Sequence, residues 1–193
     1  YVGNPLLDEI SKADFKFTYQ TQKPIIALLP GSRKQEIKAI LPEMLKIVDE
    51  YSNYQFVVAA TNTFSQEYYQ SFLKGKNVEI VFDETYGLLS NAKAALVTSG
   101  TATLETALFN VPQVVCYKLD NISFVIAKLF ININYISLVN ILSKKEVIQE
   151  LIQGDCNVKN IEKSLNLILK DSNREQIITD YVGLVKQLGQ PGC

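Results

Sequence analysis

Two short turns in this chain combine glycine, hydroxyl and charged residues in the manner of an anion-binding site. Pro30-Gly31-Ser32-Arg33 follows one apolar run and has Glu36 one helical turn further on. Ser99-Gly100-Thr101 follows another apolar run and has Thr103 and Glu105 behind it. Glycine lets a ligand approach the backbone, and the start of a following helix offers N–H groups and a positive dipole end to a phosphate.

Each turn also has a simpler interpretation. Ser32 could cap a helix whose Arg33 is solvated, and Thr101 or Thr103 could cap the other helix. Against this, the guanidinium of Arg33 could bind a phosphate through two hydrogen bonds, and Glu105 could accept hydrogen bonds from a ribose. The second turn is the stronger candidate, because its position after a strand and its small-residue composition agree.

Two further segments are weaker candidates. Phe82-Asp83-Glu84-Thr85-Tyr86 follows a third apolar run, and Tyr86 could meet a base or a sugar there. Its carboxylates are more typical of a solvated loop, so this segment is weak evidence by itself. Residues 135–142 are apolar except at Ser137 and Asn140. An amide in such a segment usually caps a helix or bonds the backbone, although it could reach a sugar hydroxyl.

The elements around these turns alternate between short β-branched runs and amphipathic segments. We predict strands over residues 25–29, 55–60, 78–82, 94–98 and 113–117, with helices over 34–51, 65–73, 87–91 and 101–109. Pro42 is expected to kink the first helix or to begin a second one. The pattern predicts an α/β fold, a Rossmann-like parallel sheet with helices on both faces, whose ligands bind at the carboxyl ends of the strands.

Beyond Tyr117 we predict no further strand. Helices are expected over residues 123–130, 144–153, 158–170 and 174–188. Asn157 or Asp155 would cap the third of these helices, and the region of Asp171 to Asn173 the fourth. Residues 189–193 form a tail rich in glycine and proline.

The composition excludes several classes of function. A formal net charge of −1 argues against nucleic acid as a partner. The chain has no histidine, which excludes histidine-based catalysis and histidine metal ligands, and its three cysteines have no metal-ligand spacing. The apolar stretch 122–142 contains a lysine and three asparagines, so it is a poor bilayer span. Since the chain starts at Tyr1 without a signal pattern, we expect a piece of a longer cytoplasmic protein, with membrane contact only at a surface.

Four motifs in this order resemble the lipid-A-disaccharide synthase family. They are Tyr1-Val2-Gly3-Asn4-Pro5-Leu6, Leu28-Leu29-Pro30-Gly31-Ser32-Arg33 with Glu36, Ser99-Gly100-Thr101-Ala102-Thr103-Leu104-Glu105, and Tyr135-Ile136-Ser137-Leu138-Val139-Asn140-Ile141-Leu142. The resemblance covers essentially the whole chain, as the C-terminal half of such an enzyme. It departs from the family at Asn4, where histidine is frequent, and at Lys93, where aspartate is common.

The resemblance implies a two-domain, B-type (GT-B) glycosyltransferase that needs no cofactor and no dedicated metal. Such an enzyme transfers 2,3-diacylglucosamine from UDP to 2,3-diacylglucosamine 1-phosphate, forming a β-1,6 linkage with inversion. Its general base is expected in the N-terminal half, outside this chain, where the lipid acceptor also binds. Residues 1–22 would be an interdomain crossover, 23–170 the UDP-binding domain, and 171–193 a helix and tail that lead back to the other domain.

The resemblance also implies a set of donor-site residues. The residues that would face the UDP-sugar are Arg33, Ser99, Gly100, Thr101 and Glu105. Asn140 and Gln153 would lie near the same cleft. With the candidates from the turns, the predicted donor site consists of Gly31, Ser32, Arg33, Glu36, Tyr86, Ser99, Gly100, Thr101, Thr103, Glu105, Asn140 and Gln153.

Two alternatives stay open. Another B-type UDP-sugar enzyme, either an N-acetylglucosaminyltransferase or a 2-epimerase, would share these turns, although the lack of histidine counts against an epimerase. A non-catalytic α/β module could instead bind a partner protein through the apolar residues 122–142.

Overall fold

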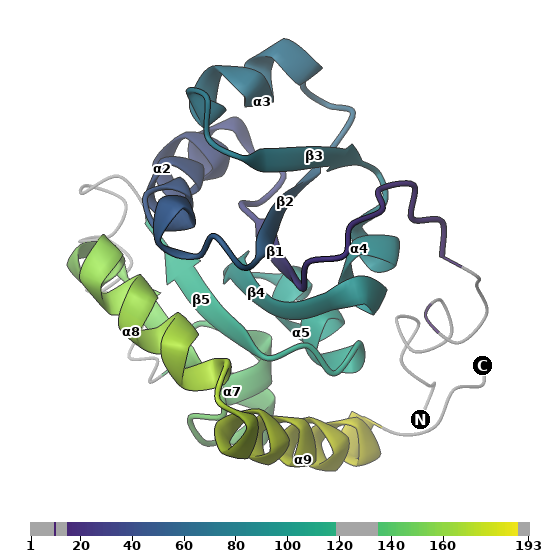
Figure 1. The fold of residues 1–193 in the computed structure, drawn as a ribbon. Helices are drawn as coiled ribbons and strands as arrows, with labels where there is room; N and C mark the ends of the chain where they lie inside the picture. Colours follow the sequence, from purple (N-terminus) through teal and green to yellow (C-terminus); the bar gives the residue numbers. More distant parts are fainter. Residues whose placement is uncertain (1–9, 11–14, 119–134, 189–193) are drawn as a thin grey trace.

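A six-stranded parallel sheet forms the centre of the protein (Figure 1). The computed structural model describes residue 10, residues 15–118 and residues 135–188. The strands lie in the order β3-β2-β1-β4-β5-β6. Their bounds are β1 Ile25–Leu29, β2 Gln55–Ala60, β3 Val78–Phe82, β4 Ala92–Thr98, β5 Gln113–Tyr117 and β6 Gln149–Ile152. All five predicted strands are confirmed, with β4 starting two residues early.

The central strand β1 is buried on both faces, which explains why it is continuously apolar. Ile26 and Leu28 belong to one hydrophobic core. Ile25, Ala27 and Leu29 belong to a second core on the opposite face of the sheet. Since helices must cover both faces, the sequence pattern of β1 already requires a layered α/β arrangement.

The helices form a layer on each face of the sheet, as Figure 1 shows. On one face lie α2 (Lys34–Leu45), α3 (Gln66–Leu73) and α8 (Val158–Ile168). On the other lie α4 (Thr85–Asn91) and α5 (Thr101–Leu108), and α7 (Leu138–Ser143) and α9 (Asp171–Leu188) pack against α5. Two short 3-10 helices, η1 (Val48–Glu50) and η2 (Gln153–Asp155), complete the described fold.

Two predicted helices differ from the structure. α2 continues through Pro42 and ends at Leu45, so proline begins no second helix. The helix predicted over residues 144–153 was wrong, because the segment contains β6. Val147, Ile148 and Leu151 have a spacing that suits a helix, but pairing with the open edge of β5 decides the structure. Asn157 caps α8 as predicted, since its Oδ1 accepts from the N–H of Asn160 at 3.1 Å. The cap region predicted at Asp171 to Asn173 was wrong, because α9 already begins at Asp171.

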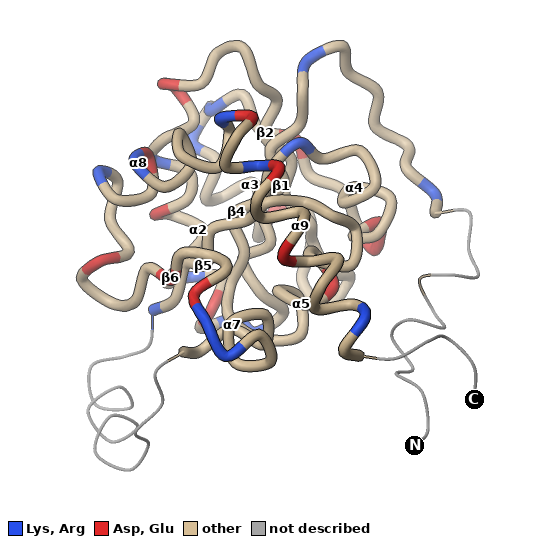
Figure 2. The backbone as a smooth tube through the Cα atoms, turned by 90° about the horizontal axis from the view of Figure 1, so that it is seen from below, with Lys and Arg blue, Asp and Glu red and all other residues tan. Residues whose placement is uncertain are grey.

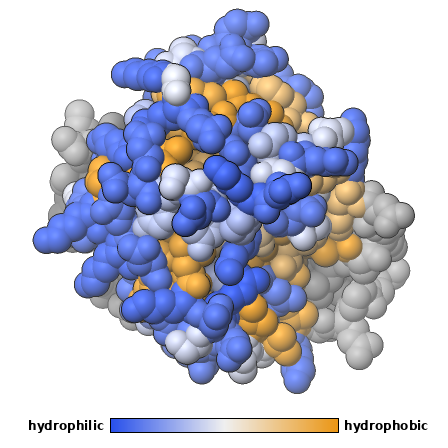
Figure 3. Space-filling model, in the orientation of Figure 1, coloured by the Kyte–Doolittle hydropathy of each residue, from blue (hydrophilic) through white to orange (hydrophobic). Residues whose placement is uncertain are grey.

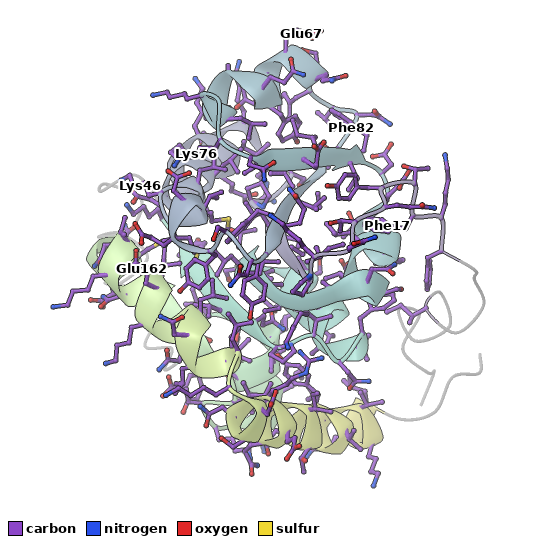
Figure 4. The ribbon with its side chains drawn as sticks, viewed as in Figure 1. Phe17, Lys46, Glu67, Lys76, Phe82 and Glu162 are labelled. Carbon is purple, nitrogen blue, oxygen red and sulfur yellow. The ribbon has the colours of Figure 1, made fainter. Side chains whose placement is uncertain are left out.

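The segment before the sheet lies directly against α4. A Cβ atom on Gly87 would overlap the carbonyl oxygen of Lys16 and stand 3.0 Å from Cβ of Phe17, so only glycine fits there. Thr18 adds hydrogen bonds from its N–H and hydroxyl to the carboxylate of Glu84, at 2.8 and 2.9 Å. Figure 4 places Phe17 beside α4. The division of the chain at residues 22 and 170 stays a prediction.

Basic and acidic residues are interspersed along the described backbone (Figure 2). The face in Figure 3 is mainly hydrophilic, with smaller hydrophobic areas between the hydrophilic residues. No helix within the described ranges is long and apolar enough to cross a bilayer. The motif at residues 1–6, the helix expected over 123–130 and the tail 189–193 lie outside the described residues.

Candidate functional site

The two glycine turns meet at the carboxyl edge of the sheet. They do so because β1 and β4 are neighbouring strands, and Leu29 at the end of β1 is paired with Val97 near the end of β4. Between them lies a hollow of about 430 Å³, which we call the β1–β4 cleft. This volume falls within the range of small-molecule sites. Its lining includes eight of the predicted residues: Gly31, Ser32, Arg33, Glu36, Ser99, Gly100, Thr101 and Glu105.

The first turn is organised by an ion pair. Arg33 donates from its backbone N–H to Glu36 Oε2 at 3.3 Å and from Nη1 to Glu36 Oε1 at 3.1 Å. The Arg33 side chain is 83% exposed, whereas that of Glu36 is 20% exposed. Arg33, rather than Ser32, is the N-cap residue of α2. Gly31 has a φ of +99°, and a Cβ there would overlap the Glu36 carboxylate. The Arg33 guanidinium therefore lies at the rim of the cleft, at the end of an exposed side chain.

The second turn is organised by its backbone. Gly100 is the N-cap residue of α5 with φ +139° and ψ −159°, a conformation that is essentially restricted to glycine. Ser99 Oγ donates to the carbonyl oxygen of Ile136 at 2.9 Å, so its one proton is already engaged within the protein. Gly100, Thr101 and Ala102 line the cleft, and the N–H groups of a first helical turn have no partner within the helix. Backbone N–H groups are thus the donors that this turn can offer.

Thr103 does not face the cleft. Its side chain is fully buried, and its hydroxyl donates to the carbonyl oxygen of Gly100 at 2.8 Å. The prediction of Thr103 as a ligand-binding residue is corrected accordingly, because its hydroxyl stabilises the turn from inside. The alternative interpretation, in which Thr101 or Thr103 caps the helix, was wrong as well. Gly100 is the N-cap residue without a side-chain cap, and the Thr103 hydroxyl donates to a carbonyl instead of accepting from an N–H group.

Two threonines of the cleft were missed in the sequence. Thr98 ends β4 and Thr61 follows β2, and both line the β1–β4 cleft. Thr98 is only 4% exposed. Neither hydroxyl finds a hydrogen-bond partner among the described residues. An unpartnered buried hydroxyl costs free energy unless a ligand or water satisfies it. Attention to the last residue of every strand, as well as to the following turns, would have found both.

Tyr86 lies in an adjoining hollow of about 390 Å³, formed where α4 meets the segment before the sheet. Its ring packs against Phe15 and Phe109, with centroid distances of 5.3 and 5.4 Å. This hollow shares Thr85 and Glu105 with the β1–β4 cleft. The two hollows are thus neighbours, and the Glu105 side chain borders both.

Asn140 and Gln153 are not brought into the cleft. Asn140 is fully buried, and its Nδ2 donates to Ile148 O and to Glu150 Oε1, both at 2.8 Å. Its Oδ1 accepts from the N–H groups of Val147 and Ile148 at 2.8 and 3.0 Å. With both amide atoms engaged, Asn140 is a structural residue, which corrects its expected place near the ligand. Gln153 lies in η2 and lines neither hollow.

The charged side chains of the cleft are one guanidinium, on Arg33, and two carboxylates, on Glu36 and Glu105. Since the carboxylates outnumber the guanidinium, binding of an anion would require the helix N-termini of α2 and α5 as well as Arg33. The charges of Arg33 and Glu36 also act on the hydroxyl of Tyr117, which ends β5. Burial and the charge of Glu36 raise the pKa of Tyr117, while Arg33 opposes this rise. Within the described ranges, no cluster of three or more cysteine, aspartate or glutamate side chains could hold a metal ion.

Comparison with known proteins identifies the family and the fold of the chain. A family model described as lipid-A-disaccharide synthetase matches residues 1–192. The chain is 34% identical to the lipid-A-disaccharide synthase of Syntrophus aciditrophicus, over 100% of this chain and 54% of the relative. It is also 34% identical to that of Psychromonas ingrahamii, over 93% of this chain and 51% of the relative. The chain thus spans about half the length of these relatives.

Two solved structures share the fold. The calicheamicin glycosyltransferase CalG4 superimposes with a TM-score of 0.60 and 16% identity, over 98% of this chain and 42% of that protein. The spinosyn rhamnosyltransferase SpnG, in complex with thymidine diphosphate, gives a TM-score of 0.60 and 13% identity, over 88% and 42%. Both are GT-B glycosyltransferases, so the predicted fold class is confirmed. From the family match along nearly its whole length, this chain belongs to the lipid-A-disaccharide synthase family.

Proposed function

We propose that this chain is the donor-binding half of a lipid-A-disaccharide synthase and that the β1–β4 cleft holds the diphosphate of its UDP-sugar. The observation that carries the proposal is the meeting of two glycine turns, each at a helix N-terminus, on neighbouring strands of one sheet edge. Ligands of open α/β sheets bind at such an edge, where the strand order reverses. Here that point lies between β1 and β4.

Each part of the donor has a matching group. The N–H groups of Gly100, Thr101 and Ala102 would bind phosphate oxygens, and Arg33 would reach them from the opposite side of the cleft. Glu105, between the two hollows, would accept hydrogen bonds from the ribose, with the base towards Tyr86. The unpartnered hydroxyl of Thr98 supports a polar ligand at the floor of the cleft.

The reaction that we propose is the transfer of 2,3-diacylglucosamine to 2,3-diacylglucosamine 1-phosphate, with a β-1,6 linkage and inversion. The acceptor O6 attacks the anomeric carbon, the bond from that carbon to the phosphate oxygen breaks, and UDP leaves. The negative charge that grows on the β-phosphate would be stabilised by the N–H groups of the second turn and by the dipole of α5. A base outside these 193 residues would take the acceptor proton.

The acyl chains of both substrates give a reason for contact with a membrane surface. We propose that the complete enzyme works at the cytoplasmic face of the inner membrane, as a peripheral protein. The chain by itself is expected to bind UDP and to catalyse no transfer, because the acceptor and the base belong to the other half.

The test is an NMR titration of the isotope-labelled 193-residue chain with UDP. We expect the amide resonances of Gly31 and Gly100 to shift, while that of Gly75, after α3 and outside both hollows, stays in place. No shift at Gly31 or Gly100 with several millimolar UDP would overturn the proposal. Competition by UDP-2,3-diacylglucosamine against UDP-N-acetylglucosamine then separates this function from that of another UDP-sugar enzyme.

A further inference from the structure

A partly buried polar cluster lies behind the second turn and connects three elements. At its centre is the carboxylate of Glu150 on β6. Glu150 Oε1 accepts from Ser137 N at 3.0 Å, from Ser137 Oγ at 2.7 Å and from Asn140 Nδ2 at 2.8 Å. Glu150 Oε2 accepts from Ile136 N at 2.8 Å. The carboxylate therefore fixes residues 136 and 137, where the chain enters α7.

One peptide unit of this cluster reaches the second turn, Ser99-Gly100-Thr101, which we call the phosphate turn after its proposed role. The carbonyl of Ile136 and the N–H of Ser137 belong to the same planar amide. Ser99 Oγ donates to that carbonyl at 2.9 Å, and the N–H donates to Glu150 at 3.0 Å. The peptide unit is rigid, and a hydrogen bond at one end polarises the other. The position of the Glu150 carboxylate therefore affects the position and strength of the hydrogen bond that Ser99 Oγ donates.

We propose that Glu150 is a positioning residue for the phosphate turn and acts through the Ile136–Ser137 peptide and Ser99. Gly100, next to Ser99, has a φ of +139°, a conformation that is open to glycine and closed to most other residues. Because glycine has no side chain to restrict it, contacts of its neighbours must fix the turn. The hydroxyl of Ser99 is the side-chain tie from this turn to the cluster. Glu150 thus orders the N–H donors without touching the ligand itself. The effect on ligand affinity rests on the proposed function, whereas the effect on the turn does not.

The residue type at position 150 suits this role. Among the described residues, the four groups that bond to the carboxylate are all hydrogen-bond donors, so the site needs acceptors on both oxygens. A glutamine has nearly the same shape, but its amide nitrogen would meet a donor. Glu150→Gln therefore disturbs the cluster with little change in volume. Glu146→Gln, an exposed position four residues earlier, is the matched control for the change in charge.

The first measurement uses the 193-residue chain without ligand. We expect Glu150→Gln to move the amide resonances of Ser99, Gly100 and Ser137, and Glu146→Gln to leave them unchanged. If Glu150→Gln does not fold, Ser99→Ala supplies the reciprocal test, since loss of its hydroxyl should move the N–H resonance of Ser137. Unchanged resonances at the far end of the peptide in the variant that folds would overturn the proposal.

The second measurement is a double-mutant cycle on UDP affinity. Glu150→Gln and Ser99→Ala should each weaken binding by about three- to tenfold, the effect of one lost hydrogen bond. In the Glu150→Gln background, Ser99→Ala should add less than about twofold, because both changes break the same path. Multiplying effects would refute a shared path. If the unmodified chain fails to bind UDP, the proposed function fails, and the ligand-free resonances still decide the role of Glu150.

Discussion

The two turns of the cleft reach the same sheet edge by different means. In the first, Arg33 carries the positive charge on a side chain that is 83% exposed and is guided by its ion pair with Glu36. In the second, the donors belong to the backbone, and the side chains of Ser99 and Thr103 bond inward, to Ile136 and Gly100. One turn offers a movable charge, whereas the other offers a fixed set of dipoles.

The difference matters for how binding energy would be used. A preset array of N–H groups loses little conformational entropy when a ligand binds, and it stabilises charge without reorganisation. An exposed arginine loses side-chain entropy and is screened by salt, but it can follow a charge that moves as a bond breaks. We therefore expect the backbone turn to dominate affinity for UDP and the arginine to contribute the part that depends on salt.

The largest effect should come from Gly100→Ala. A Cβ at this position meets no atom within 4 Å, so the change acts through the backbone conformation alone. The strain of about 2 kcal/mol should move the turn away from its N–H geometry and weaken UDP binding about thirtyfold, measured by calorimetry.

Gly75→Ala is the matched control for this strain. Gly75 also has a positive φ, of +79°, with open space around a Cβ, but it lies outside both hollows. It should lower thermal stability and leave UDP affinity unchanged. Equal losses of affinity in the two variants would mean that the turn has no special part in binding.

An intermediate effect is expected from Arg33→Ala. Loss of a charge-assisted contact should weaken UDP binding by about tenfold at low salt. At 0.5 M salt the difference from the unmodified chain should shrink to about threefold, because the exposed charge is screened. Lys34→Ala, which removes the same charge from the next, exposed residue, should change affinity little. A salt-independent loss for Arg33→Ala would contradict the distinction between the two turns.

The smallest effect should come from Thr98→Val, and its sign separates binding from stability. Without its unpartnered hydroxyl, the buried side chain should leave stability unchanged or raised, while UDP binding weakens about threefold. Thr106→Val, also buried, loses a hydrogen bond of 2.7 Å to Ala102 O. It should therefore reverse the pattern, with lower stability in chemical denaturation and unchanged affinity. A destabilised Thr98→Val variant that binds UDP normally would assign that hydroxyl a structural role.

Sequence reasoning found the sheet where burial on both faces left a clear pattern, as in Ile25–Leu29. It failed at β6, a strand of four residues on the sheet edge with Leu151 as its buried member. So short and partly exposed a segment has no periodicity of its own, and its structure depends on the partner strand β5, more than thirty residues earlier.

For the candidate site, sequence reasoning located the turns but not the direction of each side chain. Ser99, Thr103 and Asn140 are polar residues of the predicted donor site, yet all three direct hydrogen bonds into the protein. Thr98 has an unremarkable place at the end of a strand, and its unpartnered hydroxyl is visible only in three dimensions. Distant partners such as Ile136 and Glu150 decide these directions, and no local motif encodes them.

The strand order also determines when each strand can pair with its neighbours during synthesis on the ribosome. β1 pairs with β2, but its other edge pairs with β4, whose Val97 is made 68 positions after its partner Leu29. At ribosomal speeds of about 5–20 residues per second, one edge of β1 keeps unpaired backbone N–H and C=O groups for on the order of several seconds until β4 is made. Such an edge is a template for wrong pairing during that interval. The cleft, which needs the turns after both strands, is therefore assembled late, and nascent chains should need protection before they can bind any nucleotide.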